Sequence, residues 1–390
     1  MRIGIDAKIF QNENKTGIPI AIENVLRVWN EKYPENEYYL FCARDIHLDF
    51  EPKDNWHVIT SPIKAEKDPS GRKSIKYIAS VLLYNFVISP IQKIKHRTDI
   101  FWYPNYFLPF KVGSKKHVIT IHDLALFHMP QMVKLSRRLH HRIMLPWSAA
   151  RADKIIAISR ATADDIHRFF ATRKDKIAIS YEGGLHERSA EKHPYNDEMK
   201  PELNIKGRFI LFISTIEPRK NIITLIKAFE KYLDRYKDDD LYLVLAGGRG
   251  WKCDNIYKAA QTSRYKDKII MPGYITNDEK QYLFENAELF AYPSLYEGFG
   301  IPVLEAFDKG LPVITTNVSS LPEVGGDAAF YIENPKSAGE LSEQIRKVLT
   351  LTKQEKAQIR SKMEKQLKKF SWEKNAQEIM RLFKRLAAKK

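Results

Sequence analysis

Short apolar, β-branched runs alternate with longer helix-like segments along most of the chain. In the first half the runs are IGID at 3–6, YYLFC at 38–42, HVITIHD at 117–123 and KIIAIS at 154–159. This alternation is typical of parallel strands joined by crossover helices, so the first half is predicted to form an α/β domain.

The pattern restarts after a polar stretch rich in Glu, Lys and Pro at 183–207, which is the best candidate for a linker. The second set of runs predicts another doubly wound α/β domain. Its runs are FILFIS at 209–214, LYLVLAGG at 241–248, KIIMPGY at 268–274, LFAYPS at 289–294 and LPVITT at 311–316, with the helical run ITLIKAFEKYLDRY among them.

The chain is therefore expected to hold one Rossmann-like domain at 1–195 and a second at 205–372. The last segment, 373–390, has Ala376, Ile379, Met380 and Phe383 at helical spacing. It is predicted to be an amphipathic helix that packs back on the first domain. Because ligands of open α/β sheets bind beyond the carboxyl ends of the strands, the expected site lies where two Rossmann-like domains face each other across a cleft.

Composition supports a folded chain of two domains, with 390 residues, 44% hydrophobic and 29% charged. Cys42 and Cys253 are the only cysteines, so neither a disulfide framework nor a structural zinc site is indicated. The N-terminus enters an apolar strand directly, without the features of a signal peptide. A cytoplasmic location is expected.

The net charge of +16 is concentrated between Lys64 and Arg151, where 16 Lys and Arg stand against 4 Asp and Glu. An uncharged, mostly apolar run at 77–92 lies inside this block but is too short to span a bilayer. The block reads either as a surface for the anionic inner membrane face or as solvated faces. No nucleic-acid-binding motif accompanies it, so nucleic acid is not expected as a partner.

The string YPSLYEGFGIPVLEA at 292–306 is the most informative in the chain. Glu297 and Glu305 flank a Gly-Phe-Gly turn that is followed by a predicted helix. Backbone amides and a helix N-terminus favour an anion there, whereas carboxylates accept hydrogen bonds from hydroxyl groups. The string thus suggests a ligand with both phosphate and polyol, although both glutamates could also be solvated carboxylates.

A second cluster, STIEPRKN at 214–221, follows the first strand of the second half. Arg219 and Lys220 would lie at a strand end, where a bidentate guanidinium and a compact amine could neutralise a diphosphate. The alternative is that they are solvated cations at the start of a helix.

These clusters, together with further motifs, make the chain resemble the retaining glycosyltransferases of family 4, and within them bacterial mannosyltransferases of polysaccharide and lipopolysaccharide assembly. The further motifs are TGIPIAIENVL at 16–26, TIHDL at 120–124, AISRATADDI at 157–166, PGYI at 272–275 and NVSSLPEVGGDAA at 317–329. The resemblance covers nearly the whole chain and implies the GT-B architecture of two Rossmann-like domains. It implies that the domain at 1–195 binds the acceptor and that the domain at 205–372 binds the nucleotide sugar.

For the string at 292–306, the resemblance implies that Glu297 acts at the reacting centre by binding hydroxyls of the donor sugar. Glu305 would bind the ribose. The backbone of Gly298, Phe299 and Gly300 would meet the sugar and the phosphate.

For other positions, the resemblance implies that Arg219 and Lys220 stabilise the leaving diphosphate. Gly273 and Tyr274 would lie along the nucleotide base.

In the first half, His122 would lie near the donor sugar and act in catalysis, and a glycine at position 17 would let the backbone approach the donor phosphate. The alternative for His122 is a histidine at the edge of the core, hydrogen-bonded to the neighbouring Asp123.

No metal or other cofactor is expected. Asp238 and Asp240 form a DxD sequence, but they fall in a predicted turn between a helix and a strand, on the side of the sheet away from the site, and are interpreted as solvated. In enzymes of this architecture arginine, lysine and backbone amides balance the charge of the leaving group, and the nucleotide sugar is a substrate.

The sequence therefore predicts a hexosyltransferase that acts on a glycan or a lipid-linked glycan, with GDP-mannose as the favoured donor and peripheral contact with the inner membrane face. Two alternatives stay open. A sugar-nucleotide epimerase of the same architecture would react with the donor alone, and a non-catalytic subunit would bind the donor without turnover.

Overall fold

The computed structural model of the chain describes residues 1–11, 15, 17–62, 75–132, 135–184, 194–196 and 198–388. The chain divides into two compact units. Unit 1 consists of Met1–His128, Val133–Gly183 and Trp372–Lys390, and unit 2 of Met129–Met132 and Gly184–Ser371. Residues 185–193 and 197 of the predicted linker lie outside the described residues.

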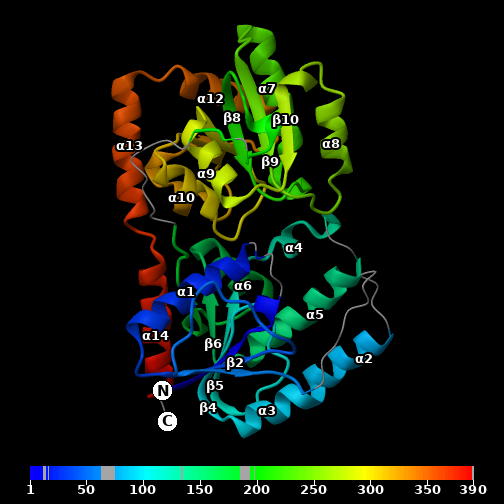
Figure 1. Cartoon of the computed structure of the whole chain (residues 1–390), viewed down its shortest axis with the longest axis vertical. Coiled ribbons are helices and arrows are strands. Elements are labelled where there is room, and N and C mark those ends of the chain that lie inside the picture. Colours follow the sequence, from blue (N-terminus) through cyan, green and yellow to red (C-terminus); the bar gives the residue numbers. More distant parts are fainter. Residues whose placement is uncertain are drawn as a thin grey trace. The chain divides into compact units, whose positions relative to one another are not determined.

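Unit 1 is built on a seven-stranded sheet in the order β3-β2-β1-β4-β5-β6-β7, in which every neighbouring pair is parallel (Figure 1). The central pairing aligns Ile3 of β1 with Ile100 of β4. The strands are β1 (Arg2–Asp6), β2 (Glu37–Phe41), β3 (Trp56–Ile59), β4 (Thr98–Tyr103), β5 (Ser114–Ile121), β6 (Lys154–Ala157) and β7 (Ile177–Ile179).

Alternate side chains of these strands enter two cores, one on each face of the sheet. In β4, Trp102 belongs to one core, whereas Phe101 and Tyr103 belong to the other. Helices of the unit cover both faces. They are α1 (Ile18–Lys32), α2 (Ile75–Leu83), α3 (Ser89–Lys95), α4 (Ala125–His128), α5 (Leu135–Arg151), α6 (Arg160–Phe170) and α14 (Trp372–Ala387).

The last helix, α14, packs in the core of unit 1 although it follows unit 2 in the sequence. Ala376, Ile379, Met380 and Phe383 are buried there. The indole nitrogen of Trp29 in α1 donates to the carbonyl oxygen of Ala376 at 3.0 Å. The apolar stripe seen in the sequence is the face that α14 buries.

Unit 2 is built on a six-stranded sheet in the order β10-β9-β8-β11-β12-β13, again with all neighbours parallel. Counted along the unit, this is the strand order 3-2-1-4-5-6 of a Rossmann-like fold. The strands are β8 (Arg208–Ile213), β9 (Leu241–Ala246), β10 (Ile269–Gly273), β11 (Leu289–Tyr292), β12 (Val313–Thr316) and β13 (Phe330–Ile332).

The helices of unit 2 follow from amphipathic runs and local caps. The predicted run at 223–236 forms α7 and buries Leu225, Phe229 and Leu233. Thr276 and Glu279 form a capping box that begins α9. The helices are α7 (Ile222–Tyr236), α8 (Asp254–Gln261), α9 (Asn277–Asn286), α10 (Ile301–Asp308), α11 (Leu321–Gly325), α12 (Ala338–Leu349) and α13 (Lys353–Leu367).

The expected α/β class with two doubly wound parallel sheets is confirmed. The nine apolar runs singled out in the sequence all contain strands. Further strands, β3, β4, β7 and β13, were not among those runs, and β7 and β13 are only three residues long.

Gly247 lies at the carboxyl edge of the second sheet, in contact with residues at the ends of two neighbouring strands. Its amide donates to the carbonyl oxygen of Gly273 at 2.8 Å, which joins the ends of β9 and β10. Its φ is 140°, and a Cβ added there would lie 1.9 Å from the carbonyl oxygen of Ser214 after β8. At Gly248 an added Cβ would meet nothing within 4 Å.

We therefore expect Gly247→Ala to lower the free energy of unfolding by roughly 2–3 kcal/mol, because backbone strain and the clash coincide. Gly248→Ala is the matched control and should change it by less than about 1 kcal/mol. Urea unfolding of the two variants measures the difference. Equal midpoints would contradict the packing described at Gly247.

Candidate functional site

The segment that carries Arg219 and Lys220 is a rigid turn at the carboxyl end of β8. Residues Pro218–Lys220 form one 3₁₀ turn, η6, and Asn221 follows in the left-handed conformation, with φ 60°. The Asn221 side-chain amide donates to the carbonyl oxygens of Pro293 at 3.0 Å and Pro335 at 2.6 Å. These bonds anchor the turn to the segments that follow β11 and β13.

The turn brings Arg219 and Lys220 onto Glu297. The Arg219 guanidinium donates to Oε2 of Glu297 at 2.7 Å, and Nζ of Lys220 donates to Oε1 at 2.7 Å. Lys220 also donates to the Tyr292 hydroxyl at 2.8 Å. The side chains of Glu297 and Lys220 are only 8% and 6% exposed. Arg219, at 19%, is the more accessible cation.

The burial and mutual charges of these side chains shift the pKa values of Glu297 and Lys220. Desolvation acts to raise the pKa of the Glu297 carboxyl, but the charges of Arg219 and Lys220 outweigh it and lower that pKa to about 2. Desolvation, followed by the Arg219 charge, lowers the pKa of Lys220. Glu297 is thus an ionised carboxylate across the neutral pH range, held between two cations.

Arg219 has a second carboxylate neighbour in Glu217. Its guanidinium lies 2.8 Å from Oε1 of Glu217, and it donates to the carbonyl oxygen of Tyr296 at 2.8 Å. The indole nitrogen of Trp251 donates to Oε2 of Glu217 at 2.9 Å. The side chain is held in place by several partners, as a group that must present charge in a fixed direction requires.

The Gly-Phe-Gly turn after Glu297 is fixed by two serines. The Ser320 hydroxyl donates to the carbonyl oxygens of Glu297 at 3.0 Å and Phe299 at 2.7 Å. The Ser319 hydroxyl accepts from the amide of Glu297 at 2.9 Å. The Phe299 ring is buried and packs edge-on against Phe370, with ring centroids 5.4 Å apart. Only the backbone of Phe299 could therefore meet a ligand.

The turn leads into α10, as the sequence predicts. Gly300 is the N-cap residue, with φ 120°, and Gly298 precedes the buried Phe299. An N-cap without a side chain leaves room for an anion at the amide end of the helix.

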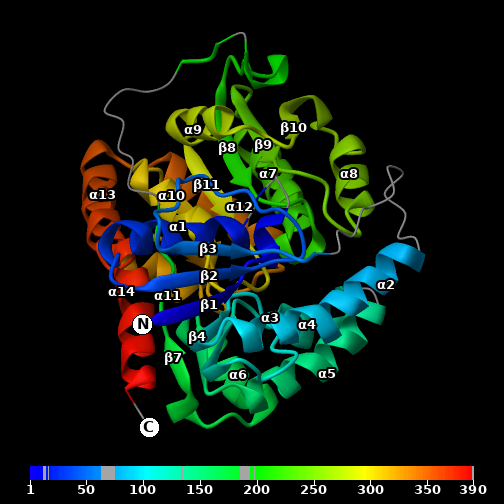
Figure 2. The same ribbon diagram turned by 60° about the horizontal axis from the view of Figure 1, so that its bottom comes forward.

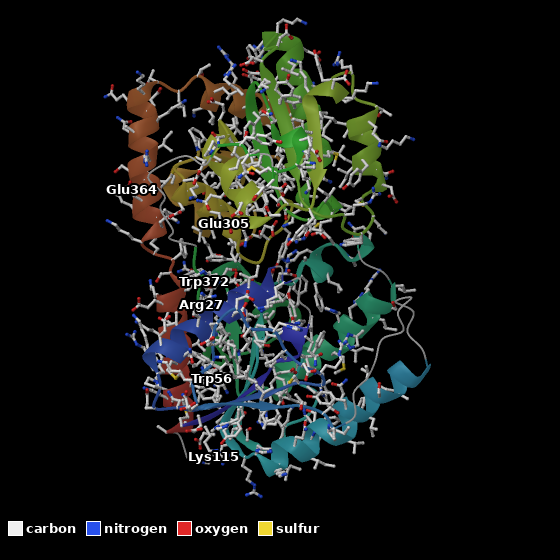
Figure 3. The ribbon with its side chains drawn as sticks, viewed as in Figure 1. Arg27, Trp56, Lys115, Glu305, Glu364 and Trp372 are labelled. Carbon is white, nitrogen blue, oxygen red and sulfur yellow. The ribbon has the colours of Figure 1, made fainter. Side chains whose placement is uncertain are left out.

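Glu305 projects from α10 (Figure 3) and pairs with a lysine of α9. Nζ of Lys280 donates to its Oε1 at 2.5 Å. Within the described residues its second oxygen, Oε2, makes no hydrogen bond, and this oxygen could accept from a hydroxyl group.

Gly273 ends β10 with φ 74°, and the Tyr274 side chain after it is 59% exposed. The carbonyl oxygen of Tyr274 accepts from Lys200. This segment is an exposed loop at the carboxyl end of β10.

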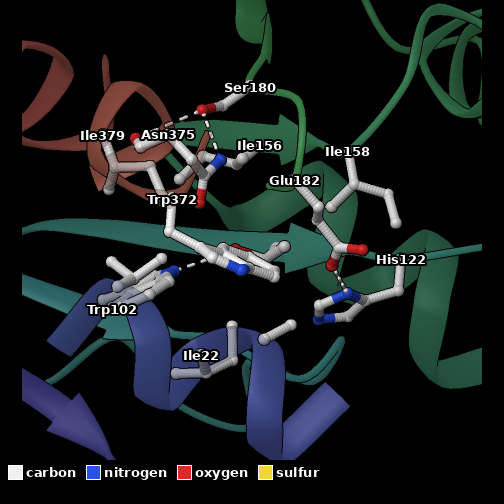
Figure 4. Close-up of a pocket in the computed structure, with 13 residues that line it drawn as sticks. Ile22, Trp102, His122, Ile156, Ile158, Ser180, Glu182, Trp372, Asn375 and Ile379 are labelled. Carbon is white, nitrogen blue, oxygen red and sulfur yellow. Dashed lines mark hydrogen bonds and ion pairs between the residues drawn. The ribbon is translucent and has the colours of Figure 1, made fainter. Parts of the chain in front are cut away.

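His122 belongs to unit 1 and is buried after β5. Its Nε2 lies 2.7 Å from the carbonyl oxygen of Pro104, which can only accept, so Nε2 carries a proton. Its Nδ1 lies 3.3 Å from Oε1 of Glu182 (Figure 4). The alternative of a bond to Asp123 is wrong, because both ring nitrogens of His122 lie against other partners. The Asp123 carboxylate accepts from the amide of Ala125 and begins α4.

The same part of unit 1 holds a small cavity of about 10 Å³, roughly the size of one water molecule. His122, Glu182 and Ser180 line its polar side, and Ile22 of α1 and Trp102 its apolar side (Figure 4). The cavity is too small for a sugar, so it is not a binding pocket for the donor.

Gly17 is the N-cap residue of α1, with φ 61°. A Cβ added there would meet nothing within 4 Å, so the backbone is open to a ligand on that side. Two positions earlier, Nζ of Lys15 donates to both oxygens of Glu23 at 2.7 and 2.8 Å. Thr16 of the sequence motif lies outside the described residues.

Several residues that complete these arrangements were not among the predicted site residues. Glu182 lies 60 positions from His122 in the sequence. The fold also brings three residues into contact with the charged cluster, namely Glu217, Tyr292 and Ser320. Tyr292 and Glu217 do stand inside the two informative strings, so their proximity to the predicted residues was an available signal.

In the part of the chain that the structure describes, no group of three or more His, Cys, Asp or Glu residues could hold a metal ion. Of the two DxD carboxylates, Asp240 is 67% exposed, as expected of a solvated turn, whereas Asp238 is not. Asp238 accepts two bonds from the Arg208 guanidinium, at 2.9 and 2.8 Å, and its side chain is 15% exposed. It secures the start of β8.

Comparisons with protein families match both halves of the chain. The model of the family Glycosyltransferase Family 4 matches residues 57–183, and that of Glycosyl transferases group 1 matches residues 196–369. The first match includes His122. The second includes Arg219, Lys220, Glu297 and Glu305.

Among curated proteins, the chain is 33% identical over 296 residues to O-antigen chain mannosyltransferase B of Escherichia coli, covering 75% of each chain. It is 25% identical over 268 residues to O-antigen chain mannosyltransferase RfbU of Salmonella typhimurium, covering 64% of this chain and 70% of that one.

Among solved structures, sucrose-phosphate synthase from Thermosynechococcus elongatus is similar with a TM-score of 0.73 at 16% identity, covering 100% of both chains. WaaG, a glycosyltransferase involved in lipopolysaccharide biosynthesis, is similar with a TM-score of 0.62 at 19% identity, covering 99% of this chain and 98% of that one. At these identities the likeness establishes the fold.

Proposed function

Since the chain belongs to glycosyltransferase family 4 and is an enzyme of the GT-B fold, we propose that it transfers a hexose from a nucleotide diphosphate sugar to a hydroxyl group of a glycan, with retention at the anomeric carbon. The observation that carries the proposal is the buried cluster of Arg219, Lys220 and Glu297 at the carboxyl edge of the second sheet.

The cluster has the charges that such a reaction needs. As the bond between the anomeric carbon and the phosphate oxygen breaks, negative charge grows on the diphosphate. Arg219, the more exposed cation, and Lys220 would stabilise that charge. Glu297 holds both cations in place before the donor arrives, and its oxygens can still accept from hydroxyls of the donor sugar.

Retention in glycosidases usually requires a carboxylate nucleophile opposite an acid. No residue is assigned that role here. We propose instead that the acceptor oxygen bonds to the anomeric carbon on the face that the leaving phosphate vacates. The hydroxyl proton passes to that phosphate oxygen, and the enzyme positions the groups and balances charge.

The favoured donor is GDP-mannose and the favoured acceptor a growing polysaccharide or lipid-linked glycan. The Escherichia coli relative, 33% identical over 75% of both chains, is an O-antigen chain mannosyltransferase, which supports mannose and an O-antigen type of glycan. We propose that the transfer proceeds without a bound metal, because Arg219 and Lys220 can neutralise the diphosphate themselves.

For the remaining predicted residues we propose the roles that the family resemblance implies: contact with the donor for His122 and Gly17, the ribose for Glu305, and the base for Gly273 and Tyr274. We propose a cytoplasmic location with peripheral contact at the inner membrane face. None of the described helices combines the length and apolar character needed to cross a bilayer.

Incubation with GDP-mannose, UDP-sugars and dTDP-rhamnose, with and without a glycan acceptor, tests the proposal. A transferase releases free nucleotide and lengthens the acceptor. An epimerase would convert the donor without acceptor, and a binding subunit would do neither. Either of the last two results with every donor and a matched acceptor would overturn the proposed activity.

Donor binding should depend on Glu305. A ligand that binds only the folded protein raises its melting temperature, so GDP-mannose is expected to do so in a concentration-dependent way. Glu305→Gln should weaken donor affinity about tenfold or more, through the loss of a charged hydrogen-bond acceptor.

The matched control is Glu285→Gln. Glu285 is a partly buried carboxylate of α9 that pairs with Lys309 at 2.9 Å, and it is not a predicted donor ligand. Titration of the melting temperature with GDP-mannose measures both affinities. An unchanged affinity for Glu305→Gln, or an equal loss for both variants, would remove Glu305 from the donor site.

A further inference from the structure

The helical segment at 75–95 in unit 1 turns apolar side chains to the outside. It runs through α2, the π-helical turn η2 (Tyr84–Ile88) and α3 without interruption. Phe86 and Ile91 are each 59% exposed. Among the described side chains of the segment, Leu82, Leu83, Val87 and Ile94 are also exposed. Contiguous apolar exposure of this kind marks an interaction surface.

The inner side of the same segment is polar. Tyr84, Ser89 and Lys93 are buried. Nζ of Lys93 lies 4.3 Å from the centre of the Phe101 ring and donates to the Tyr103 hydroxyl at 3.3 Å. Burial lowers the pKa of Lys93 to about 8. A helix on a water-exposed surface shows the opposite arrangement, with its polar side outward.

Helix α5 carries a second exposed apolar stripe. Leu135, Leu139, Ile143 and Trp147 recur every four residues, which places them along one side of the helix. Their exposed fractions are 76%, 60%, 59% and 51%. A surface helix of a water-soluble domain would turn such a stripe into its core.

The two stripes belong to one region of unit 1. Phe86 packs against Phe110, with ring centroids 5.7 Å apart, and Phe107 in the same loop packs against His140 of α5 at 4.9 Å. Figures 1 and 2 both show α5 running alongside α2 and α3. We call the exposed apolar side chains of 82–94 and 135–147 the apolar face.

The charges around the apolar face have a single sign. The sequence has no Asp or Glu at 75–98 or at 124–152. Lys95, Arg97, Arg142 and Arg151 are exposed beside the apolar side chains, and the Arg151 guanidinium lies 5.0 Å from the centre of the Trp147 ring. A second copy of the chain would bring like charges together, whereas an anionic lipid surface attracts them. Of the basic block, residues 64–74, 133 and 134 lie outside the described residues.

We propose that the apolar face binds in the plane of a bilayer that contains anionic lipid, with Phe86, Ile91, Leu139 and Trp147 at the boundary between headgroups and acyl chains. Helices that bind in this way combine an apolar side with flanking cations. This surface deepens the proposed function, on which it rests, because it holds the enzyme where a lipid-linked acceptor is found.

Vesicle flotation tests the proposal without any use of transfer activity. The full chain should float with vesicles of phosphatidylcholine mixed with phosphatidylglycerol, and much less with phosphatidylcholine alone. Phe86→Ser combined with Ile91→Ser should weaken binding at least about tenfold, since two inserted side chains are lost. Arg142→Gln should weaken it about fivefold in the mixed vesicles.

Val58→Ser combined with Ile179→Ser is the matched control, because both side chains are exposed apolar groups on the sheet of unit 1, at 47% and 40%. This control should bind like the wild type. Trp147 supplies a second measurement: vesicles should shift tryptophan emission to shorter wavelength, and Trp147→Phe should remove most of the shift.

Absence of wild-type binding to the mixed vesicles would overturn the proposal, as would wild-type binding by the Phe86 and Ile91 variant. Light scattering provides a third outcome. If the wild type is a dimer that these substitutions dissociate and no vesicle binding is seen, a second copy covers the face and the proposal is wrong. Nucleotide release with a water-soluble acceptor is measured separately and reports on the proposed function alone.

Discussion

Replacing Lys220 by Met is expected to lower kcat/KM for sugar transfer by about 10²- to 10³-fold, the usual cost of removing one preorganised charge-stabilising group. The substitution keeps most of the side-chain volume but removes the amine that lies 2.7 Å from Glu297. The leaving diphosphate would lose one of two cations. Release of free nucleotide with a saturating acceptor measures the effect.

The control for this experiment is Lys227→Met, which removes an exposed cation of α7 in the same unit. It should transfer sugar like the wild type. Lys220→Arg, which keeps the charge, should retain more activity than Lys220→Met. Near wild-type transfer by Lys220→Met, in a variant that still folds, would show that the diphosphate is bound elsewhere.

Glu297→Gln is expected to destabilise the protein as well as to impair transfer. Removing one member of a buried ion pair leaves charge uncompensated and costs roughly 3–5 kcal/mol. Here two cations, Arg219 and Lys220, would lose their shared carboxylate. Urea unfolding at neutral pH measures the loss. Glu288→Gln, which breaks a partly exposed pair with Lys356, should cost less than about 1 kcal/mol.

The pH dependence of that difference has a definite sign. The pKa of Glu297 is lowered from 4.5 to about 2 in the folded protein, so its stabilisation is complete above pH 4.5 and is lost as the pH falls toward 2. The stability difference between wild type and Glu297→Gln should therefore be constant from pH 5 to 8 and shrink below 4.5. A constant difference down to pH 2.5 would contradict the ion-pair account.

Much of the fold could be predicted because continuous apolar runs such as FILFIS and LYLVLAGG, bounded by polar or turn residues, are typical of buried parallel strands. β4 was missed although it is central in its sheet and its last four residues, Ile100–Tyr103, form a continuous apolar run. β7 and β13 were missed because three residues carry too little pattern.

The site was predictable only as far as the two informative strings reach. Arg219, Lys220 and Glu297 could be named, yet their shared ion network depends on how the turn anchored by Asn221 packs on the segment after β11. The pairing of His122 with Glu182 joins the ends of two strands, β5 and β7. Neither contact is encoded by local spacing, because both arise from strand order.

The position of α14 in the core of unit 1 affects the order in which the two units can fold during synthesis. Unit 2 is almost continuous in sequence, from Gly184 to Ser371, apart from Met129–Met132. Unit 1 lacks part of its core until α14 has been synthesised, because Trp29 donates to Ala376 and packs on Phe383. On the ribosome, where domains usually mature from the N-terminus onward, this protein would complete its second unit before its first.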